Sequence, residues 1–178
     1  MRTMNPDRSI LLLVDFQARL MPAIEDGAAV VRNARRLREA AGLMGIPVVL
    51  TEQNPEGLGG TVPELSPRPD DTILRKTAFD ACREAAFAAK LPDRPDVVVA
   101  GCETHVCVLQ TALGLLDAGR RVFLVRDAVG SRRAESREAA IRRMECHGAE
   151  VVTAEMAVFE WLGSSGHPRF REMLSLVK

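Results

Sequence analysis

Short apolar runs of strand length alternate along the chain with longer segments in which apolar residues recur at helical spacing. The runs predict strands at residues 10–14, 47–50, 73–74, 97–100, 122–125 and 151–152, and the helical spacing predicts helices at 30–44, 81–89, 105–118, 134–147, 156–162 and 170–176. A continuous apolar run such as 10–14 is typical of a strand buried on both faces. The alternation therefore predicts an α/β fold of three layers, in which helices cover both faces of a six-stranded parallel sheet.

The residues that follow the predicted strands are the first candidates for chemistry, because ligands bind at the carboxyl ends of the strands in such sheets. Asp15 ends a wholly apolar strand, where a carboxylate is costly unless it is paired or used. The alternative is a helix cap or a structural ion pair. Lys76 follows the third strand and is one of only three lysines among 24 basic residues. A lysine in a chain that otherwise uses arginine suggests a site that needs a compact ammonium group.

Cys107 is the strongest candidate for a nucleophile. Thr104 is a good N-cap, which predicts that Cys107 is the third residue of the helix that follows. The positive end of the helix dipole would lower the pKa of this thiol, and free backbone N–H groups would offer donors to an oxyanion. The alternative is a small buried apolar residue, which is our interpretation of the three other cysteines, Cys82, Cys102 and Cys146.

Composition narrows the range of functions. The 178 residues carry 24 Lys and Arg against 24 Asp and Glu, so no basic field attracts a nucleic acid, and aromatic residues are only 4% of the chain. The apolar runs are too short to cross a membrane and the chain start has no signal-peptide core, which predicts a cytoplasmic protein with no membrane partner. With 47% hydrophobic residues, the chain suits one globular domain over residues 1–178. Four cysteines without a CxxC pair predict neither disulfides nor a zinc site.

Three segments that carry the candidate residues resemble the signature segments of the isochorismatase-like cysteine hydrolases: LLVDFQ at 12–17, KTAF at 76–79 and VAGCETHVCV at 99–108. The resemblance covers nearly the whole chain in the same order, and the later segments are most similar to the small single-domain branch of that superfamily. It implies a Rossmann-like order of the six strands and a catalytic triad of Asp15, Lys76 and Cys107. The residues agree with this triad, with the carboxylate as base and the ammonium stabilising both anions.

The resemblance also implies a mechanism. Cys107 would attack the carbonyl of a small-molecule amide or related C–N acyl substrate to form a thioester, while the backbone N–H groups of Glu103 and Cys107 hold the oxyanion. Relatives turn the chain at this point with a cis peptide bond, which in this sequence is the Cys102–Glu103 bond. The candidates to line the substrate pocket, which lie near the same strand ends, are Phe16, Gln53, Phe79 and His105.

The resemblance also bears on cofactors and partners. Nicotinamidases bind a metal with an Asp and histidines between the first and third strands, whereas this chain has no His between Met1 and Lys76. We therefore expect no metal and no cofactor. Oligomers are common among relatives, and the apolar segment 159–177 suits a contact between copies, so the expected partners are a small-molecule substrate and other copies of this chain.

Other functions compete with this hypothesis. A phosphoacceptor receiver domain needs an acidic pair on its first strand, and a dinucleotide-binding domain needs GxGxxG after it, but residues 16–24 contain no glycine. Vinyl-ether hydrolysis of the isochorismatase type does not require a cysteine nucleophile, so the presence of Cys107 favours acyl chemistry. A non-catalytic oligomeric binding scaffold that kept the fold is the main alternative, and the reactivity of Cys107 distinguishes it from an enzyme.

Overall fold

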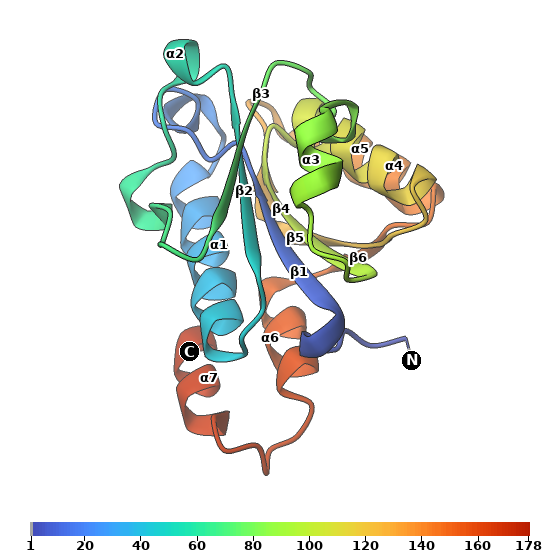
Figure 1. Ribbon diagram of the computed structural model, residues 1–178. Coiled ribbons are helices and arrows are strands. Elements are labelled where there is room, and N and C mark those ends of the chain that lie inside the picture. The colour runs from blue at the N-terminus through green and yellow to red at the C-terminus, as the bar shows by residue number, and fades with distance from the viewer. Residues whose placement is uncertain (1) are drawn as a thin grey trace.

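The structure, a computed structural model, contains one six-stranded sheet in which every strand pair is parallel (Figure 1). It describes residues 2–178, so Met1 of the predicted domain lies outside the described residues. The strands are β1 (Ser9–Val14), β2 (Val48–Gln53), β3 (Thr72–Lys76), β4 (Asp96–Cys102), β5 (Arg121–Gly130) and β6 (Glu150–Val152), in the order β3-β2-β1-β4-β5-β6. The predicted α/β fold and its Rossmann-like strand order are confirmed.

Two layers of helices cover the sheet, as predicted. The helices α1 (Gly27–Leu43), α6 (Ala154–Leu162) and α7 (Phe170–Val177) pack on one face, and α3 (Ala85–Lys90), α4 (Leu109–Asp117) and α5 (Ala134–Cys146) pack on the other (Figure 1). Strand β1 is buried along its whole length because successive residues enter opposite layers: Leu11 and Leu13 join the core beneath α1, and Leu12 joins the core beneath α4.

The site is positioned by the reversal of strand order between β1 and β4. These two strands are neighbours in the sheet, and the chain leaves β1 towards the layer of α1 but leaves β4 towards the layer of α4. The two connections diverge at the carboxyl ends of the strands, which opens the crevice where ligands bind in such sheets.

Three local predictions are wrong. Strand β5 continues to Gly130 instead of ending at Val125, because the register between β4 and β5 shifts between Val99 and Gly101 and the pairing then resumes. Residues 104–108 form a single π-helical turn before α4 begins at Leu109. The helix predicted at 81–89 is a short 3-10 turn, Ala81–Arg83, followed by α3.

The long connection between β2 and β3 has structure of its own. It contains the short helix α2 (Pro55–Leu58) and the 3-10 turn Pro63–Leu65, and its Thr61 pairs with Gln17 in an isolated antiparallel bridge. The Gln17 side chain also donates to the carbonyl of Gly59, at 2.6 Å. These contacts tie the connection to the end of β1. No helix among residues 2–178 is long and apolar enough to span a membrane.

Candidate active site

A buried ion pair joins the ends of β1 and β3. Lys76 Nζ lies 2.7 Å from Asp15 Oδ2, and both side chains are almost fully buried. Strand β2 lies between these two strands, so the lysine reaches its partner across β2 with its long stem. Thr51, on β2, donates its hydroxyl to the other carboxylate oxygen of Asp15, at 2.6 Å. The carboxylate is therefore fixed at both oxygens, as a buried charge must be.

Gln53 connects the ion pair to the thiol. Its Oε1 accepts a hydrogen bond from Lys76 Nζ at 2.7 Å and lies 4.0 Å from Cys107 Sγ. The amide is oriented because its Nε2 donates to the carbonyl of Thr77, at 2.7 Å. The backbone N–H of Gln53 donates to the side chain of Gln17, at 2.8 Å. We had expected Gln53 to line the substrate pocket, and the structure places it between the ammonium and the thiol.

Burial decides the protonation of Cys107. Its side chain lies in the core layer beneath α4 and is only 6% exposed. The pKa of this thiol is raised to about 12, chiefly by burial and also by repulsion from the Asp15 carboxylate, while the Lys76 ammonium acts in the opposite direction. The predicted lowering of the pKa is therefore wrong, because the favourable charge does not offset desolvation. A thiol with its pKa raised in this way is protonated at neutral pH.

The backbone before Cys107 has the predicted turn. The Cys102–Glu103 peptide bond is cis, and Gly101 has a φ of +149°. A Cβ atom at Gly101 would lie 2.3 Å from the carbonyl oxygen of Val14, so only glycine allows β4 to approach β1 this closely. The side chain of Glu103 accepts hydrogen bonds from the backbone N–H and the Nε of Arg132, at 3.1 and 3.0 Å. These contacts turn the Glu103 carboxylate towards the loop after β5.

The predicted N-cap at Thr104 is wrong. Thr104 is the first residue of the π-helical turn, and its buried hydroxyl has no hydrogen-bond partner among the described residues. The turn is closed by the backbone, because the N–H groups of Val106 and Val108 both donate to the carbonyl of Glu103, at 3.0 and 3.3 Å. Cys107 therefore lies within a π turn, one turn before the regular α-helix.

The loop after β3 is held by a side chain that the sequence analysis missed. Glu84 Oε1 accepts hydrogen bonds from the backbone N–H groups of Thr77 and Ala78, at 3.0 Å each. The bond from Ala78 and then that from Thr77 are the main causes of the lowered pKa of Glu84. The carbonyls of Ala78 and Phe79 in turn face Lys76 Nζ, at 3.4 and 3.5 Å. Glu84 thus fixes the segment that surrounds the ammonium.

Three residues predicted to line the pocket have different surroundings. Phe79 is 51% exposed, and its backbone carbonyl lies 3.5 Å from Lys76 Nζ. Phe16 is 1% exposed and packs in the core beneath α1, in the opposite layer from Cys107, so its lining assignment is not retained. His105 is half-buried, and its Nδ1 lies 3.0 Å from Ser131 Oγ.

The other three cysteines have different surroundings. Burial raises the pKa of Cys82 to about 12 and raises that of Cys102 as well, and Cys146 is exposed on α5. Among residues 2–178, no three His, Cys, Asp or Glu side chains are grouped as metal ligands would be. Two of the residues that surround the ion pair, Thr51 and Gln17, are polar and lie near the carboxyl ends of strands, so their positions in the sequence could have identified them. No feature of the sequence marks Glu84.

Known proteins match this chain closely. The isochorismatase domain family model matches residues 9–156. Isochorismatase domain-containing protein 1 from Salmo salar is 37% identical over 175 residues, which cover 97% of this chain but only 62% of that protein. The chain thus spans less than two thirds of the length of this relative.

Solved structures share the fold over almost the full chain. The MAR1 ribonuclease from Caenorhabditis elegans superimposes with a TM-score of 0.94 at 37% identity, covering 98% of this chain and 92% of that one. The YcaC gene product from Escherichia coli, an octameric hydrolase of unknown specificity, has a TM-score of 0.83 at 26% identity, covering 98% of this chain and 96% of its own.

Proposed function

Because the chain belongs to the isochorismatase family, whose hydrolase fold it has, we propose that it is a cysteine hydrolase of small-molecule amides or related C–N acyl compounds. One observation carries the proposal. The buried Lys76–Asp15 ion pair is linked through Gln53 Oε1 to the Cys107 thiol, at 2.7 Å on the ammonium side and 4.0 Å on the sulfur side. A base, a cation and a protonated nucleophile are the groups that acyl transfer through a thioester requires.

The first half-reaction forms the thioester. Asp15 takes the proton of the Cys107 thiol as the sulfur attacks the substrate carbonyl, and Lys76 offsets the negative charge that passes from the carboxylate to the sulfur. The backbone N–H groups of Glu103 and Cys107 donate to the oxyanion of the tetrahedral intermediate. When that intermediate collapses, the C–N bond breaks, and the amine or ammonia leaves with the proton that Asp15 had taken.

The second half-reaction regenerates the enzyme. Asp15 removes a proton from a water molecule, the resulting hydroxide attacks the thioester carbonyl, and the carboxylic acid product leaves. The proton on Asp15 returns to the sulfur of Cys107. The net reaction consumes one amide and one water and releases one acid and one amine, and no group on the protein is oxidised or reduced.

Other activities have less support from this chain. Vinyl-ether cleavage does not require a cysteine nucleophile, so the presence of Cys107 near the ion pair favours acyl chemistry. The name of the nematode relative suggests RNA hydrolysis. The composition of this chain does not favour RNA as a substrate, because the chain has no net charge to attract phosphates and few aromatic residues to stack on bases. A non-catalytic scaffold would not need a buried carboxylate and ammonium beside a thiol.

The proposal extends to assembly and location. We propose a homo-oligomer, because Phe79, Met156 and Phe159 are large apolar side chains left exposed and the bacterial neighbour is octameric. A cytoplasmic location is part of the same proposal.

Ammonia release from a panel of small primary amides and N-carbamoyl compounds tests the activity. The wild-type chain and a Cys146→Ala variant, whose lost thiol is exposed on α5, should release ammonia from the same substrates at similar rates. The Cys107→Ala variant should release none. Equal rates from Cys107→Ala and wild type would reject the cysteine mechanism, and no release from any substrate by wild type would favour the scaffold.

A further inference from the structure

A groove lies along α1, away from the catalytic residues. It has a volume of about 630 Å³, within the range of small-molecule sites. Its walls come from the 3-10 turn Met21–Ala23, from α1, from residues 62–64 and from α7. None of Asp15, Lys76 or Cys107 lines it, and α1 covers the face of the sheet opposite to the layer that holds Cys107.

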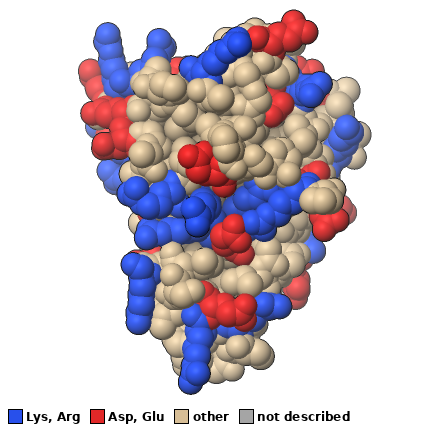
Figure 2. Space-filling view, turned by 90° about the vertical axis from the view of Figure 1, so that its left-hand side faces the viewer, with Lys and Arg blue, Asp and Glu red and all other residues tan. Residues whose placement is uncertain are grey.

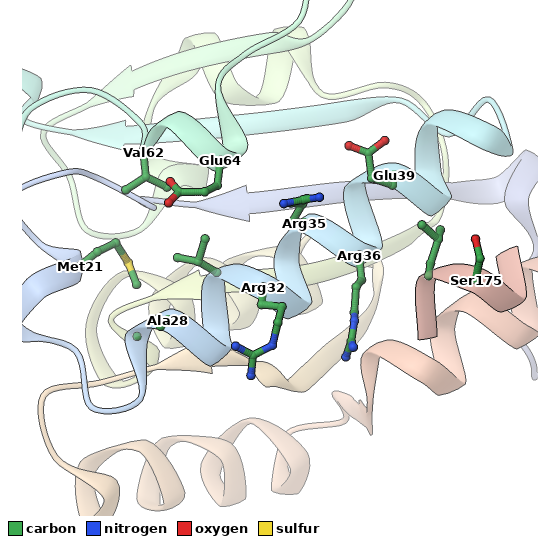
Figure 3. Close-up of a pocket in the computed structure, with 12 residues that line it drawn as sticks. Met21, Ala28, Arg32, Arg35, Arg36, Glu39, Val62, Glu64 and Ser175 are labelled. Carbon is green, nitrogen blue, oxygen red and sulfur yellow. The ribbon is translucent and has the colours of Figure 1, made fainter. Parts of the chain in front are cut away.

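The groove combines apolar side chains with three arginines. The apolar residues that line it are Met21, Ala28, Val31, Val62 and Leu176. Arg32, Arg35 and Arg36 come from consecutive turns of α1, and Figure 3 shows Arg32 and Arg36 extending from the same side of the helix. The face on which α1 lies carries a band of Lys and Arg side chains (Figure 2).

Three arginines and two carboxylates, Glu39 and Glu64, line the groove, so its lining carries a net positive charge. Within the part of the chain that the structure describes, none of the three arginines forms an ion pair, although Arg36 donates to Asn33 Oδ1 at 3.1 Å. Glu39 is already paired with Arg68, at 2.6 Å. Arg32 and Arg36, four residues apart on one side of α1, repel one another, and a bound anion would offset that repulsion.

The walls of the groove are fixed before any ligand binds. Arg38, on the buried side of α1, donates to the carbonyl of Leu65 and pairs with Asp71, which ties the turn Pro63–Leu65 to the helix. At the other end, Met173 and Leu176 of α7 pack against the core beneath α1. A preformed cavity loses little entropy when it closes on a ligand.

We propose that this groove is a second binding site, for a small organic anion with an apolar body. The carboxylate or phosphate of the ligand would be held by the guanidinium groups of Arg32 and Arg36, four residues apart on one side of α1. The apolar body of the ligand would lie on Val31 and the other apolar residues that line the groove. Neither an inorganic ion nor an uncharged apolar compound satisfies both halves of the groove.

Calorimetric titration with decanoate tests the site, with decanol, acetate and inorganic phosphate as comparison ligands. Decanoate should bind the wild-type chain, and each comparison ligand should bind about tenfold more weakly or less, because each lacks the charge or the apolar body. The Arg32→Gln/Arg36→Gln variant should lose about tenfold in affinity for decanoate. The matched control is Arg142→Gln/Arg143→Gln, which removes the same charge from exposed arginines on α5 and should bind as wild type does.

Several outcomes would overturn the proposal. Equal binding of decanoate by the groove variant and wild type would place the ligand elsewhere, and equal binding of phosphate and decanoate would indicate an adventitious ion only. A change of oligomeric state in the groove variant, measured by sedimentation velocity, would identify this face as a contact between copies. Binding of a single-stranded RNA that the groove variant loses, without binding of decanoate, would assign the arginines to a nucleic acid.

Discussion

At the scale of single residues, the surroundings of Lys76 predict that no other cation can replace it. Lys76 Nζ is buried within 2.7 Å of both Asp15 Oδ2 and Gln53 Oε1, a space that fits a compact ammonium. A planar guanidinium would displace one of these oxygens. We predict that Lys76→Arg lowers the rate of amide hydrolysis at least about 100-fold, nearly as much as Lys76→Ala.

The control for this prediction is Lys90→Arg, which makes the same change at an exposed position on α3 and should keep full activity. Rates measured by ammonia release compare the variants directly. Full activity in Lys76→Arg would mean that only a positive charge is needed at this position.

The buried thiol predicts a dependence of stability on pH. Burial raises the pKa of Cys107 from its ordinary value of 9.0 to about 12, so the folded chain holds this proton more tightly than the unfolded chain. The resulting stabilisation is complete below pH 9 and is lost as the pH rises towards 12. We predict that the melting temperature of wild type falls above pH 9 and that the fall is shallower in Cys107→Ala.

Melting curves recorded from pH 8 to about 11 measure this difference. Cys82 contributes a fall of the same sign, because burial raises its pKa to about 12 as well, so Cys107→Ala reduces the slope without abolishing it. Parallel curves for wild type and Cys107→Ala would show that the thiol is not desolvated in the folded chain.

At the scale of elements, the segment after β3 depends on Glu84. This carboxylate accepts hydrogen bonds from the backbone N–H groups of Thr77 and Ala78, and the carbonyl of Ala78 lies 3.4 Å from Lys76 Nζ. We predict that Glu84→Ala lowers kcat and that Glu84→Gln, which keeps an acceptor oxygen, recovers part of the loss. Glu145→Ala, an exposed change on α5, is the control. Unchanged kcat in Glu84→Ala would mean that the loop keeps its place without this carboxylate.

The close approach of β4 to β1 at Gly101 predicts how a substitution there changes stability. A Cβ at position 101 would collide with the backbone of Val14, 2.3 Å away, and Gly101 also has a positive φ. We predict that Gly101→Ala lowers the free energy of unfolding by about 3 kcal/mol or more. Gly42→Ala, in α1 with only the Arg68 side chain near its Cβ, should be neutral or stabilising. Denaturant unfolding of both variants measures the difference.

Local sequence patterns were sufficient to predict most of the helices and strands, but not the residues at which they end. All six strands were predicted, because each one contains at least two consecutive apolar residues. The continuation of β5 through the exposed Arg126 was not predicted. It depends on a register shift against β4 that no property of residues 126–130 encodes. The π turn was missed for a similar reason: Thr104 has the chemistry of a cap, but the backbone of Glu103 closes the turn instead.

The candidate site was predictable where strand ends carried unusual residues. Asp15, Lys76 and Cys107 all lie at such ends, and the structure brings Asp15 into contact with Lys76 and places both near the thiol. The sequence did not predict that the pKa of Cys107 is raised and not lowered, because the shift depends on how deeply the π turn buries the thiol in the core. The role of Gln53 as a contact of Lys76 also required the packed structure.

At the scale of the whole molecule, exposed apolar side chains predict assembly. Phe79 lies beside the proposed site, and Met156 and Phe159 lie on α6, each at least a third exposed. Contiguous apolar surface often marks a contact with a partner, and Met156 and Phe159 lie side by side on α6. We predict that light scattering gives a molar mass that is a multiple of the chain mass of 19.4 kDa. A mass of one chain at every concentration would contradict the homo-oligomer and would leave Phe79 open to solvent.

The central claim is that Cys107 carries the acyl group during turnover, and the mass of the quenched enzyme tests it most directly. Wild-type protein is mixed with its best amide substrate, stopped in acid during turnover, and analysed by intact mass and peptide mapping. We expect a mass increase equal to the acyl group on the Cys107 peptide, removable by hydroxylamine and absent in Cys107→Ala. Turnover without an acyl group on Cys107, or with the acyl group on another residue, would rule out Cys107 as the nucleophile.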